Sequence, residues 1–421
     1  MSANPIAQLR NVRGRMTKES DSAPPRMTID ASSLSHAPGV RSIFKALNGE
    51  ARFVGGCVRD ILLGQKPGDI DITTPWQPES VMKRLQAAGL SVHPIGIDHG
   101  TVLAVTEDKL GQYEITTLRK DVETDGRHAV VAFTQSYRED ALRRDLTFNA
   151  MSLDQAGNLY DYFQGIEDLE AGHVRFVGDA RSRIQEDRLR ILRYFRFYAR
   201  YGATPPDAET RDALIDEIHG IDALSGERLN QELSRMLVGP RPAMIIQMML
   251  DYGLLEPLIG LPIDLEGLRR LVGVEGALQL GDVQRRFAVL LGRSRQRIDL
   301  LADKFRWPNR DRQRMRLMAD GALPPLELGP MIYRFGSRAA QDWLILSAAS
   351  LNQPVNPELW QMAQEWRPPT FPITGQHILD AGYTPGPTIG EIRLKLEEWW
   401  ISHDFKPSLE ELLAYLDQLN G

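Results

Sequence analysis

The sequence predicts an α+β domain at the N-terminus, with a small mixed sheet and flanking helices, followed by an all-α neck, body and tail. Up to about residue 160, short β-forming runs lie between turns, with one helix-like stretch at 78–88. This mixture is typical of a compact domain with one sheet. After about Ile184, apolar residues recur at helical spacing and Gly and Pro interrupt them. The expected strands are 52–54, 69–73, 102–105, 112–118 and 130–133.

The chain of 421 residues is longer than one average domain, so several units are expected. Residues 1–27 mix Arg, Ser and Pro without the apolar run of a signal peptide, which predicts a disordered leader. A transit peptide is the alternative for this segment. The α+β head then spans residues 28–160, a helical neck spans 161–225, and the helical body and tail span 226–421.

Cysteine content and hydropathy indicate a protein of a reducing compartment. Cys57 is the single cysteine, which excludes an intramolecular disulfide. The best candidate for a membrane span, 244–263, is interrupted by Asp251, Glu256 and Pro257, so we expect no segment to cross a membrane. We therefore expect a cytoplasmic location, and no obligate protein partner is evident from the sequence.

Positive charge gathers in one segment of an otherwise acidic chain. The net charge is −6, but residues 285–316 hold ten arginines and Lys304 against three aspartates. Such a run usually marks a solvated helix face. The preference for Arg, with Phe305 and Trp307 interleaved, also fits contacts to nucleic-acid phosphates. Both interpretations stay open, and the candidate phosphate contacts are Arg285, Arg286, Arg306, Arg310 and Arg314.

A glycine turn is the strongest local signal. Residues 53–60 read Phe-Val-Gly-Gly-Cys-Val-Arg-Asp, so a β run enters Gly55 and Gly56. Because glycine has no Cβ, the backbone amides there can approach a polyphosphate closely. A helix expected at 58–63 would point its N-terminal amides at the same anion, and Arg59 would add a cation. The segment therefore predicts a phosphate-binding turn.

Two aspartates, Asp69 and Asp71, follow the glycine turn in an expected strand. Residues two apart on a strand point to the same face, so their carboxylates are expected to converge. Two like charges so close need a cation between them, and such hard oxygen ligands suit Mg²⁺ held with substrate phosphates. Glu114, on the expected strand 112–118, is the best placed residue to complete a two-metal site. A solvated strand residue is the alternative for Glu114.

Two further motifs offer contacts for a nucleoside. The run 143–150 reads Arg-Arg-Asp-Leu-Thr-Phe-Asn-Ala, in which Arg144 and Asp145 put donors beside an acceptor. A ribose 2′-hydroxyl, which both donates and accepts hydrogen bonds, requires such a pair. Asp187 and Arg190 are three apart on an expected helix, so they share a face that can bind the edge of a nucleobase. A surface ion pair and an intrahelical salt bridge are the respective alternatives.

Together these motifs resemble the nucleotidyltransferase superfamily of DNA polymerase β. Gly-Gly-x-Val-Arg-Asp followed by Asp-x-Asp looks like the branch that contains tRNA CCA-adding enzymes and bacterial poly(A) polymerases. The run 143–150 is similar to that branch's ribose motif, 185–190 to its Glu-Asp-x-x-Arg nucleobase motif, and 161–168 to its link between head and neck. The match runs in the family's order from about residue 53 to 201, over a third of the chain.

The resemblance implies a nucleotidyltransferase head that uses Mg²⁺, and it implies a role for each motif. The family's metal-binding and catalytic carboxylates correspond to Asp69 and Asp71, and Glu114 is the third catalytic carboxylate. Its flexible loop, implicated in the switch from C to A, resembles 120–128, where a plain surface loop is the alternative. The implied loop residues are Asp125, Gly126 and Arg127, and the implied nucleotide-binding residues are Gly55, Gly56, Arg59, Arg144, Asp145, Asn149, Asp187 and Arg190.

An Asp–Arg pair can select bases without a template strand. Cytosine and adenine each present an amino donor beside a ring-nitrogen acceptor, which matches the acceptor of Asp187 and the donors of Arg190. Guanine and uracil present a carbonyl in place of the amino group and would leave the carboxylate unpaired, which costs several kcal/mol when it is buried. The pair therefore predicts selection of C and A.

Within this branch the sequence favours CCA addition over poly(A) addition. Bacterial poly(A) polymerases carry a basic Gly-Arg-Arg-Phe-like stretch where this chain reads Pro-Ile-Gly-Ile-Asp-His-Gly-Thr over 94–101. The expected function is template-independent addition of CCA to the tRNA 3′ end from CTP and ATP, with two Mg²⁺ ions. The helical body would bind tRNA by shape and backbone charge. The alternatives are a bacterial poly(A) polymerase, a non-catalytic tRNA-binding scaffold, and an HD phosphohydrolase suggested by His403 and Asp404.

Overall fold

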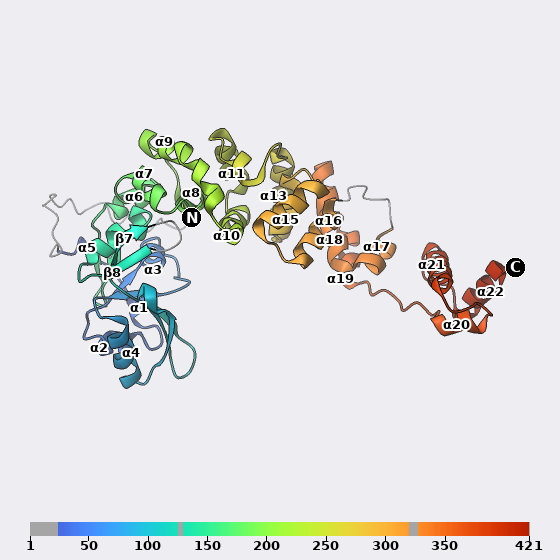
Figure 1. Cartoon of the computed structure of the whole chain (residues 1–421), viewed down its shortest axis with the longest axis horizontal. Coiled ribbons are helices and arrows are strands. Elements are labelled where there is room, and N and C mark those ends of the chain that lie inside the picture. The colour runs from blue at the N-terminus through green and yellow to red at the C-terminus, as the bar shows by residue number, and fades with distance from the viewer. Residues whose placement is uncertain (1–23, 125–128, 320–326, 421) are drawn as a thin grey trace. The chain divides into compact units, whose positions relative to one another are not determined.

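The computed structural model describes residues 24–124, 129–319 and 327–420. The chain forms two compact units, Met1–Leu261 and Pro262–Gly421, and Figure 1 labels their elements in chain order. A mixed sheet with helices in the first unit and a helical remainder confirm the predicted fold class. The finer division into leader, head, neck and body stays a prediction.

An eight-stranded mixed sheet forms the centre of the first unit, in the order β1-β10-β9-β2-β3-β6-β5-β4. Strands β3 and β6 run parallel, whereas the other neighbouring strands of this sheet run antiparallel. Burial alternates along β5 and β6, where Val102 and Ile115 face the core. The strands are β1 (Met27–Thr28), β2 (Arg52–Val54), β3 (Asp71–Thr74), β4 (Ser91–Gly96), β5 (Thr101–Val105), β6 (Gln112–Thr117), β9 (Ser152–Leu153) and β10 (Asn158–Tyr160).

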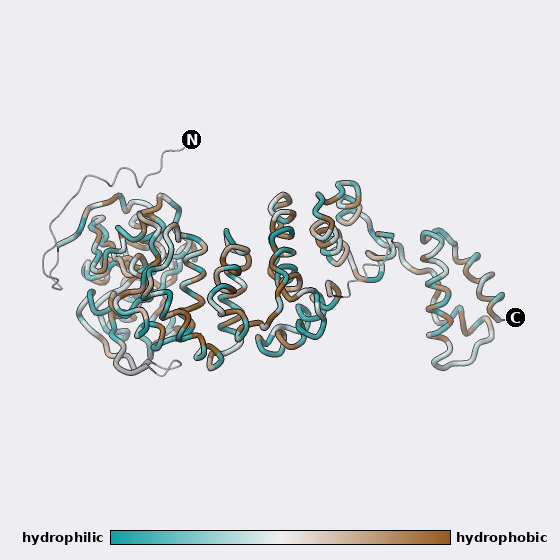
Figure 2. Tube along the Cα trace, turned by 90° about the horizontal axis from the view of Figure 1, so that it is seen from above, coloured by the Kyte–Doolittle hydropathy of each residue, from teal (hydrophilic) through white to brown (hydrophobic). Residues whose placement is uncertain are grey.

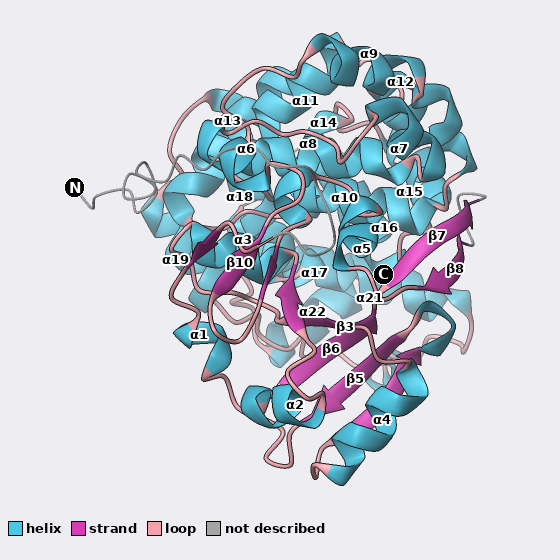
Figure 3. Cartoon of the chain, turned by 90° about the vertical axis from the view of Figure 1, so that its left-hand side faces the viewer, coloured by secondary structure: helices cyan, strands magenta, loops and turns pink. Residues whose placement is uncertain are grey.

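The helix predicted at 78–88 is present as α4 (Pro78–Ala87). Pro78 stands in its first turn, where the missing backbone N–H leaves no hydrogen bond unmade. Val81 and Leu85, one turn apart, are buried because α4 packs on β4 and β5. In Figure 3, α4 and α2 (Val40–Ala46) lie beside the strands of the sheet.

The N-terminal edge of the sheet corrects the predicted boundary of the leader. Met27 lies in β1 opposite Leu159 of β10, and the amide of Arg26 donates to the carbonyl of Leu159 at 2.8 Å. Strand β10 has backbone N–H and C=O groups along its edge, and β1 pairs with them. Residues 26 and 27 therefore belong to the fold, and residues 1–23 lie outside the described residues.

A two-stranded sheet occupies part of the segment expected to be a flexible loop. Strand β7 (Arg119–Thr124) pairs antiparallel with β8 (Ala129–Phe133). The predicted strand at 130–133 needs a partner for its backbone groups, and residues 120–124 supply it. Residues 120–124 therefore form a strand and not a plain surface loop, while the family's flexible-loop role for this segment stays a prediction. The expected loop residues Asp125, Gly126 and Arg127 lie outside the described residues.

Helices make up the rest of the first unit. Leu192 and Phe195, three apart on α8, are buried where α8 packs against α10 and α11. The remaining helices are α1 (Ser32–Ser35), α3 (Gly56–Leu62), α5 (Tyr137–Leu142), α6 (Gly165–Ala171), α7 (Ala180–Glu186), α8 (Leu189–Tyr201), α9 (Ala208–Asp216), α10 (Gly226–Leu237), α11 (Pro242–Asp251) and α12 (Leu255–Ile259), with a short 3₁₀ turn η3 (Thr147–Asn149).

The second unit is helical throughout its described residues. Hydrophobic and hydrophilic residues alternate along its helices in Figure 2, as in amphipathic helices around a core. None of the described helices is long and apolar enough to span a bilayer. The helices are α13 (Leu265–Leu278), α14 (Val283–Leu290), α15 (Arg295–Phe305), α16 (Asn309–Ala319), α17 (Leu328–Phe335), α18 (Ser337–Leu351), α19 (Pro357–Glu365), α20 (Gly375–Asp380), α21 (Pro387–Ser402) and α22 (Leu409–Asn420).

Candidate active site

The glycine turn connects β2 to α3 and lies beside a carboxylate and a guanidinium. Gly55 has a φ of 73° and a ψ of −127°, a conformation that residues with a Cβ rarely adopt. A Cβ atom at Gly55 would lie 3.4 Å from Arg144 Nη1 and 3.9 Å from Asp71 Oδ2. Helix α3 begins at Gly56, two residues before its predicted start. The turn thus brings backbone amides next to two side chains that the sequence marked for nucleotide and metal binding.

Strand β3 pairs Asp71 with Glu114 across the parallel ladder to β6, so Glu114 lies on the neighbouring strand as predicted. Asp69, in contrast, lies exposed in a bend before β3. The convergence of the two carboxylates stays a prediction, and the strand itself begins at Asp71, two residues later than predicted. The reason is that β2, the antiparallel partner of β3, ends at Val54, opposite Asp71.

Carboxylate charges nevertheless act on Asp71. Burial raises the pKa of Asp71 above its ordinary value, and the charges of Glu114 and Asp69 raise it further, while Arg144 opposes the rise. A divalent cation would relieve this repulsion, and carboxylate oxygens are the ligands that Mg²⁺ prefers. Across the described residues, no group of three acidic, His or Cys side chains is arranged to hold a metal ion. The donor chemistry fits such an ion, although these carboxylates do not form a closed cluster.

Asp140, which was not among the predicted site residues, holds both arginines of the ribose motif. This buried residue of α5 accepts hydrogen bonds from Arg144 Nη2 at 3.1 Å and from Arg143 Nε at 2.9 Å. Burial alone would raise the pKa of Asp140, but Arg144 and Arg143 lower it below its ordinary value. Asp140 and Arg144 are four residues apart, a spacing typical of ion pairs near a helix end, which could have revealed the pair.

Asp145 turns away from Arg144 and joins a separate cluster. Its Oδ2 accepts from Arg193 Nε at 2.8 Å and Nη2 at 2.5 Å, and its Oδ1 accepts from Asn149 Nδ2 at 3.1 Å and the Leu146 amide at 2.8 Å. Burial would raise the pKa of Asp145, but Arg193 and these hydrogen bonds lower it to about 2. The predicted arrangement of Arg144 and Asp145 as one donor and acceptor pair is wrong, because the two side chains bind different partners.

Arg59 lies inside the protein beside the same cluster. Its Nη1 donates to Asn149 Oδ1 at 2.6 Å and its Nη2 donates to Asp60 Oδ1 at 3.0 Å. Its guanidinium also lies 4.8 Å from the ring centre of Tyr201. Arg59 is buried in these contacts, so in this structure it orients Asn149. Its predicted contact with the triphosphate stays a prediction.

The predicted base-reading pair spans a break between two helices. Helix α7 ends at Glu186 and α8 begins at Leu189, while Asp187 has an extended backbone with φ −152° and ψ 105°. The prediction that Asp187 and Arg190 share one helix face is therefore wrong. The break is stabilised by the Asp187 carboxylate, whose Oδ1 accepts from the Leu189 amide at 3.1 Å, an amide without a partner inside α8.

Asp187 and Arg190 each pair with a different residue. Asp187 Oδ2 lies 2.8 Å from Arg228 Nη2, and 27% of the Asp187 side chain is exposed. Arg190 Nη1 lies 2.5 Å from Glu186 Oε2 and donates to the carbonyl of Arg183 at 2.8 Å. The salt bridge between Asp187 and Arg190 that was the alternative interpretation does not form. Arg228 was missed because it is distant in sequence.

Proteins of known name match nearly the whole chain. Residues 51–175 match the family model "Poly A polymerase head domain", and residues 206–262 match "Probable RNA and SrmB- binding site of polymerase A". The CCA tRNA nucleotidyltransferase 1, mitochondrial, of Danio rerio is 37% identical over 399 residues, 90% of each chain. The CCA-adding enzyme of Streptococcus pneumoniae is 33% identical over 405 residues, 93% of this chain and 99% of that one. The chain belongs to the family of CCA-adding tRNA nucleotidyltransferases.

Solved structures of this CCA-adding family share the fold. The crystal structure of the Bacillus stearothermophilus CCA-adding enzyme in complex with CTP matches with a TM-score of 0.77 at 26% identity, over 91% of this chain and 98% of that one. The Thermotoga maritima CCA-adding enzyme complexed with tRNA matches in fold with a TM-score of 0.63. The predicted family is confirmed, and the full-length relatives carry the CCA-adding name, which favours this branch over the poly(A) polymerases.

In this CCA-adding family member, three of the candidate phosphate contacts belong to an ion network inside the helical unit. Glu275 of α13 accepts from Arg285 Nε at 2.8 Å and from Arg286 Nε at 2.6 Å. Asp342 Oδ1 of α18 accepts from Arg285 Nη1 and Arg314 Nη2, both at 2.7 Å. Buried charges require such partners. These arginines therefore hold helices together, which corrects the prediction that they contact RNA.

The other basic residues of this segment lie nearer to solvent. Arg316 pairs with Asp299 at 2.7 Å on the surface, as the interpretation of a solvated helix face expects. Arg306 and Arg310 are exposed, and Arg306 ends α15 in the left-handed conformation with φ 53°. Contacts of Arg306 and Arg310 with phosphates stay a prediction.

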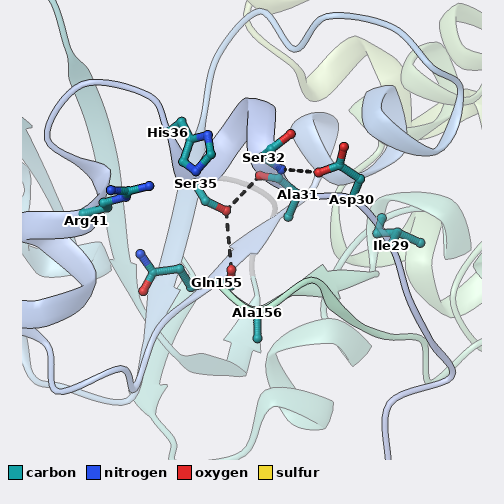
Figure 4. A pocket seen from close by; sticks show the side chains of 9 residues that line it. All are labelled: Ile29, Asp30, Ala31, Ser32, Ser35, His36, Arg41, Gln155 and Ala156. Carbon is teal, nitrogen blue, oxygen red and sulfur yellow. Dashed lines mark hydrogen bonds between the residues drawn. The ribbon is translucent and has the colours of Figure 1, made fainter.

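A pocket of about 340 Å³ beside α1 contains none of the predicted site residues (Figure 4). Ser35 Oγ in its wall donates to the carbonyls of Ala31 at 2.8 Å and Gln155 at 3.4 Å. The Ser32 amide donates to Asp30 Oδ1 at 2.8 Å. Since these polar groups satisfy one another, we assign the pocket no function in the family's reaction.

Proposed function

We propose that this protein adds CCA to the 3′ end of tRNA without a nucleic-acid template, from CTP and ATP. The observation that carries the proposal is the meeting of Gly55, Asp71 and Arg144 at one point, where a Cβ at Gly55 would lie within 3.4 and 3.9 Å of the two side chains. The names of the relatives and the CTP-bound state of one solved neighbour support the same substrates. A non-catalytic tRNA-binding scaffold would not require this arrangement.

In the proposed reaction the 3′-hydroxyl of tRNA attacks the α-phosphate of the nucleotide, and pyrophosphate leaves. Arg144, held by Asp140, directs positive charge toward the triphosphate beside the glycine turn. The carboxylates of Asp71 and Glu114, with Asp69 near them, would hold two Mg²⁺ ions. When bound, such ions activate the attacking hydroxyl and neutralise the leaving group.

The experiment that tests this function supplies purified protein with tRNA that lacks CCA, or that ends in C or CC. We expect incorporation of two C and then one A, only in the presence of a divalent cation, and no extension of tRNA that already ends in CCA. Long A tracts on any RNA would instead identify a poly(A) polymerase. Binding of tRNA without incorporation would identify a scaffold.

We expect Asp187→Ala to relax base choice more than it weakens nucleotide binding. The Asp187 carboxylate, partly exposed beside Arg228, would accept from the amino group of C or A, and an alanine cannot reject the carbonyl of U or G. The preference for CTP over UTP should fall by about tenfold to a hundredfold, as for loss of a charged hydrogen bond of about 1.5–3 kcal/mol. Relative kcat/KM for the four triphosphates measures this effect.

Asp212→Ala is the matched control for this variant, because Asp212 lies exposed on α9 and pairs only with its neighbour Arg211 among the described contacts. It should leave base choice unchanged. If Asp187→Ala rejects UTP and GTP to the same extent as the wild type, Asp187 has no part in base selection.

We expect Mg²⁺ to stabilise the wild-type protein through Asp71. Folding raises the pKa of Asp71, so the ionised side chain destabilises the fold; this penalty is absent well below pH 3.8, grows as pH rises, and is complete above the folded pKa. In EDTA at pH 7, Asp71→Asn should therefore melt above the wild type, by about 2–4 °C for each kcal/mol. Added MgCl₂ should raise the melting temperature of the wild type only. An equal rise in both proteins would put the bound ions elsewhere.

For the RNA interface we propose the exposed Arg306 and Arg310 as phosphate contacts of tRNA. A cytoplasmic location is part of the same proposal. The Danio rerio relative is mitochondrial by name, whereas the streptococcal one is not.

A further inference from the structure

We infer that Arg193 is a positioning residue through which helix α8 sets the sugar selectivity of the nucleotide site. This inference rests on the proposed function, since it concerns how that site distinguishes a ribonucleotide from a deoxyribonucleotide. Arg193 lies one helical turn after Arg190, a residue of the base-reading motif, and reaches the ribose motif at Asp145. It thus connects the elements proposed to bind base and sugar.

Asp145 has no acceptor position left for a ribose hydroxyl. An ionised carboxylate offers about four lone-pair positions. Two donors from Arg193 occupy those of Oδ2, and the Leu146 amide and Asn149 Nδ2 occupy those of Oδ1. The role of Asp145 is therefore to orient its neighbours.

The cluster around Asp145 fixes the amide of Asn149 in one orientation. Asn149 Oδ1 accepts from Arg59 Nη1 at 2.6 Å, and one N–H of Nδ2 donates to Asp145 Oδ1 at 3.1 Å. The second N–H of Asn149 has no partner among the described residues. An amide held at both ends in this way presents that N–H as a donor for a ribose hydroxyl oxygen.

The cluster depends on the charge of Arg193. It is the one guanidinium hydrogen-bonded to the Asp145 carboxylate among the described residues. Without Arg193, this buried carboxylate would be left with neutral donors only, so it would reorient toward solvent or take up a proton. Reorientation breaks the hydrogen bond that orients Asn149, and a proton on the carboxylate weakens it. A nucleotide that offers a 2′-hydroxyl then loses a contact that a deoxynucleotide never made.

The experiment compares CTP with 2′-deoxyCTP on wild type, Arg193→Met and Arg193→Lys. Affinities come from isothermal titration calorimetry without tRNA, and kcat/KM comes from transfer to tRNA. For Arg193→Met we expect the preference for CTP to fall by about tenfold, or about 1.4 kcal/mol, through weaker binding of CTP with 2′-deoxyCTP unchanged. Arg193→Lys keeps the charge but loses the planar pair of donors, so its preference should be intermediate.

Arg200→Met is the matched control, because Arg200 lies on the same helix and donates to Gln65 at an exposed site. It should keep the wild-type preference. In an Asn149→Ala background, Arg193→Met should cause no further loss of preference, since the effect passes through Asn149.

An equal loss of affinity for both nucleotides in Arg193→Met and Arg193→Lys would overturn the inference and leave Arg193 a purely structural role. An undiminished preference in folded Arg193→Lys and Arg193→Met would overturn it too. If Arg193→Met does not fold, Arg193→Lys alone tests the inference. A wild-type chain that binds CTP over 2′-deoxyCTP but transfers nothing to tRNA refutes the proposed function, while the calorimetric comparison still tests Arg193.

Discussion

Asparagine in place of Asp71 is expected to lower the rate of nucleotide transfer by at least about 10³-fold, or about 4 kcal/mol. Asp71 is the carboxylate nearest the glycine turn, opposite Glu114 and beside Arg144. Asparagine keeps the shape of the side chain but removes the charge that would hold a divalent cation. The barrier therefore rises at the chemical step, while the surface that binds tRNA is unaltered.

Single-turnover incorporation of labelled CTP into tRNA without CCA measures this loss, and a filter-binding assay measures tRNA affinity. Asp212→Asn, an exposed aspartate on α9, is the matched control and should transfer at the wild-type rate. Substantial transfer by Asp71→Asn would refute the assignment of Asp71 as a metal ligand. Loss of tRNA binding together with transfer would show instead that the variant is misfolded.

The sequence predicted those parts of the site that depend on local patterns. The glycine turn follows from the need of Gly55 for a positive φ, and the positions of Asp71 and Glu114 on strands follow from the β-forming runs that contain them. The strands β2, β5, β6 and β8 and the helix α4 also follow from short-range propensities and spacing. Each of these features is determined by residues close in sequence.

Features that depend on distant partners were not predictable in this way. Asp187 leaves the helix because its carboxylate binds the Leu189 amide and Arg228, and Arg228 is 41 residues away. Arg144 and Asp145 are adjacent in sequence but separate in space, since Asp140 binds one and Arg193 the other. Helical spacing places Arg193 one turn from Arg190, but it does not indicate that Arg193 binds the buried carboxylate of Asp145.

The charges of the basic segment 285–316 likewise depend on partners that lie outside it. Composition gives a local excess of positive charge, but it does not indicate which side chains are buried. Arg285 and Arg286 are buried against Glu275, an acidic residue ten and eleven positions earlier and outside the segment. A count of charge within a window therefore overestimates the positive surface available to RNA.

Replacement of Glu275 by glutamine is expected to destabilise the second unit by about 3–5 kcal/mol, the usual cost of removing one member of a buried ion network. Glu275 is fully buried and gives one oxygen to Arg285 and the other to Arg286. Glutamine can keep one of these contacts. The amide N–H groups of glutamine would then face the second guanidinium. That guanidinium would remain charged but would have no carboxylate oxygen at that position.

Hydrogen exchange of the amides of α14 and α18 measures the loss, because the opening free energy of these helices reports on the second unit alone. Glu266→Gln is the matched control: it lies on the same helix α13 and pairs at the surface with Arg269 and Arg270, where such pairs contribute little. If Glu275→Gln exchanges no faster than Glu266→Gln, the network does not stabilise the unit. In that case the buried positions of Arg285 and Arg286 would no longer argue against a role in tRNA binding, because the two side chains could leave their partners at little cost.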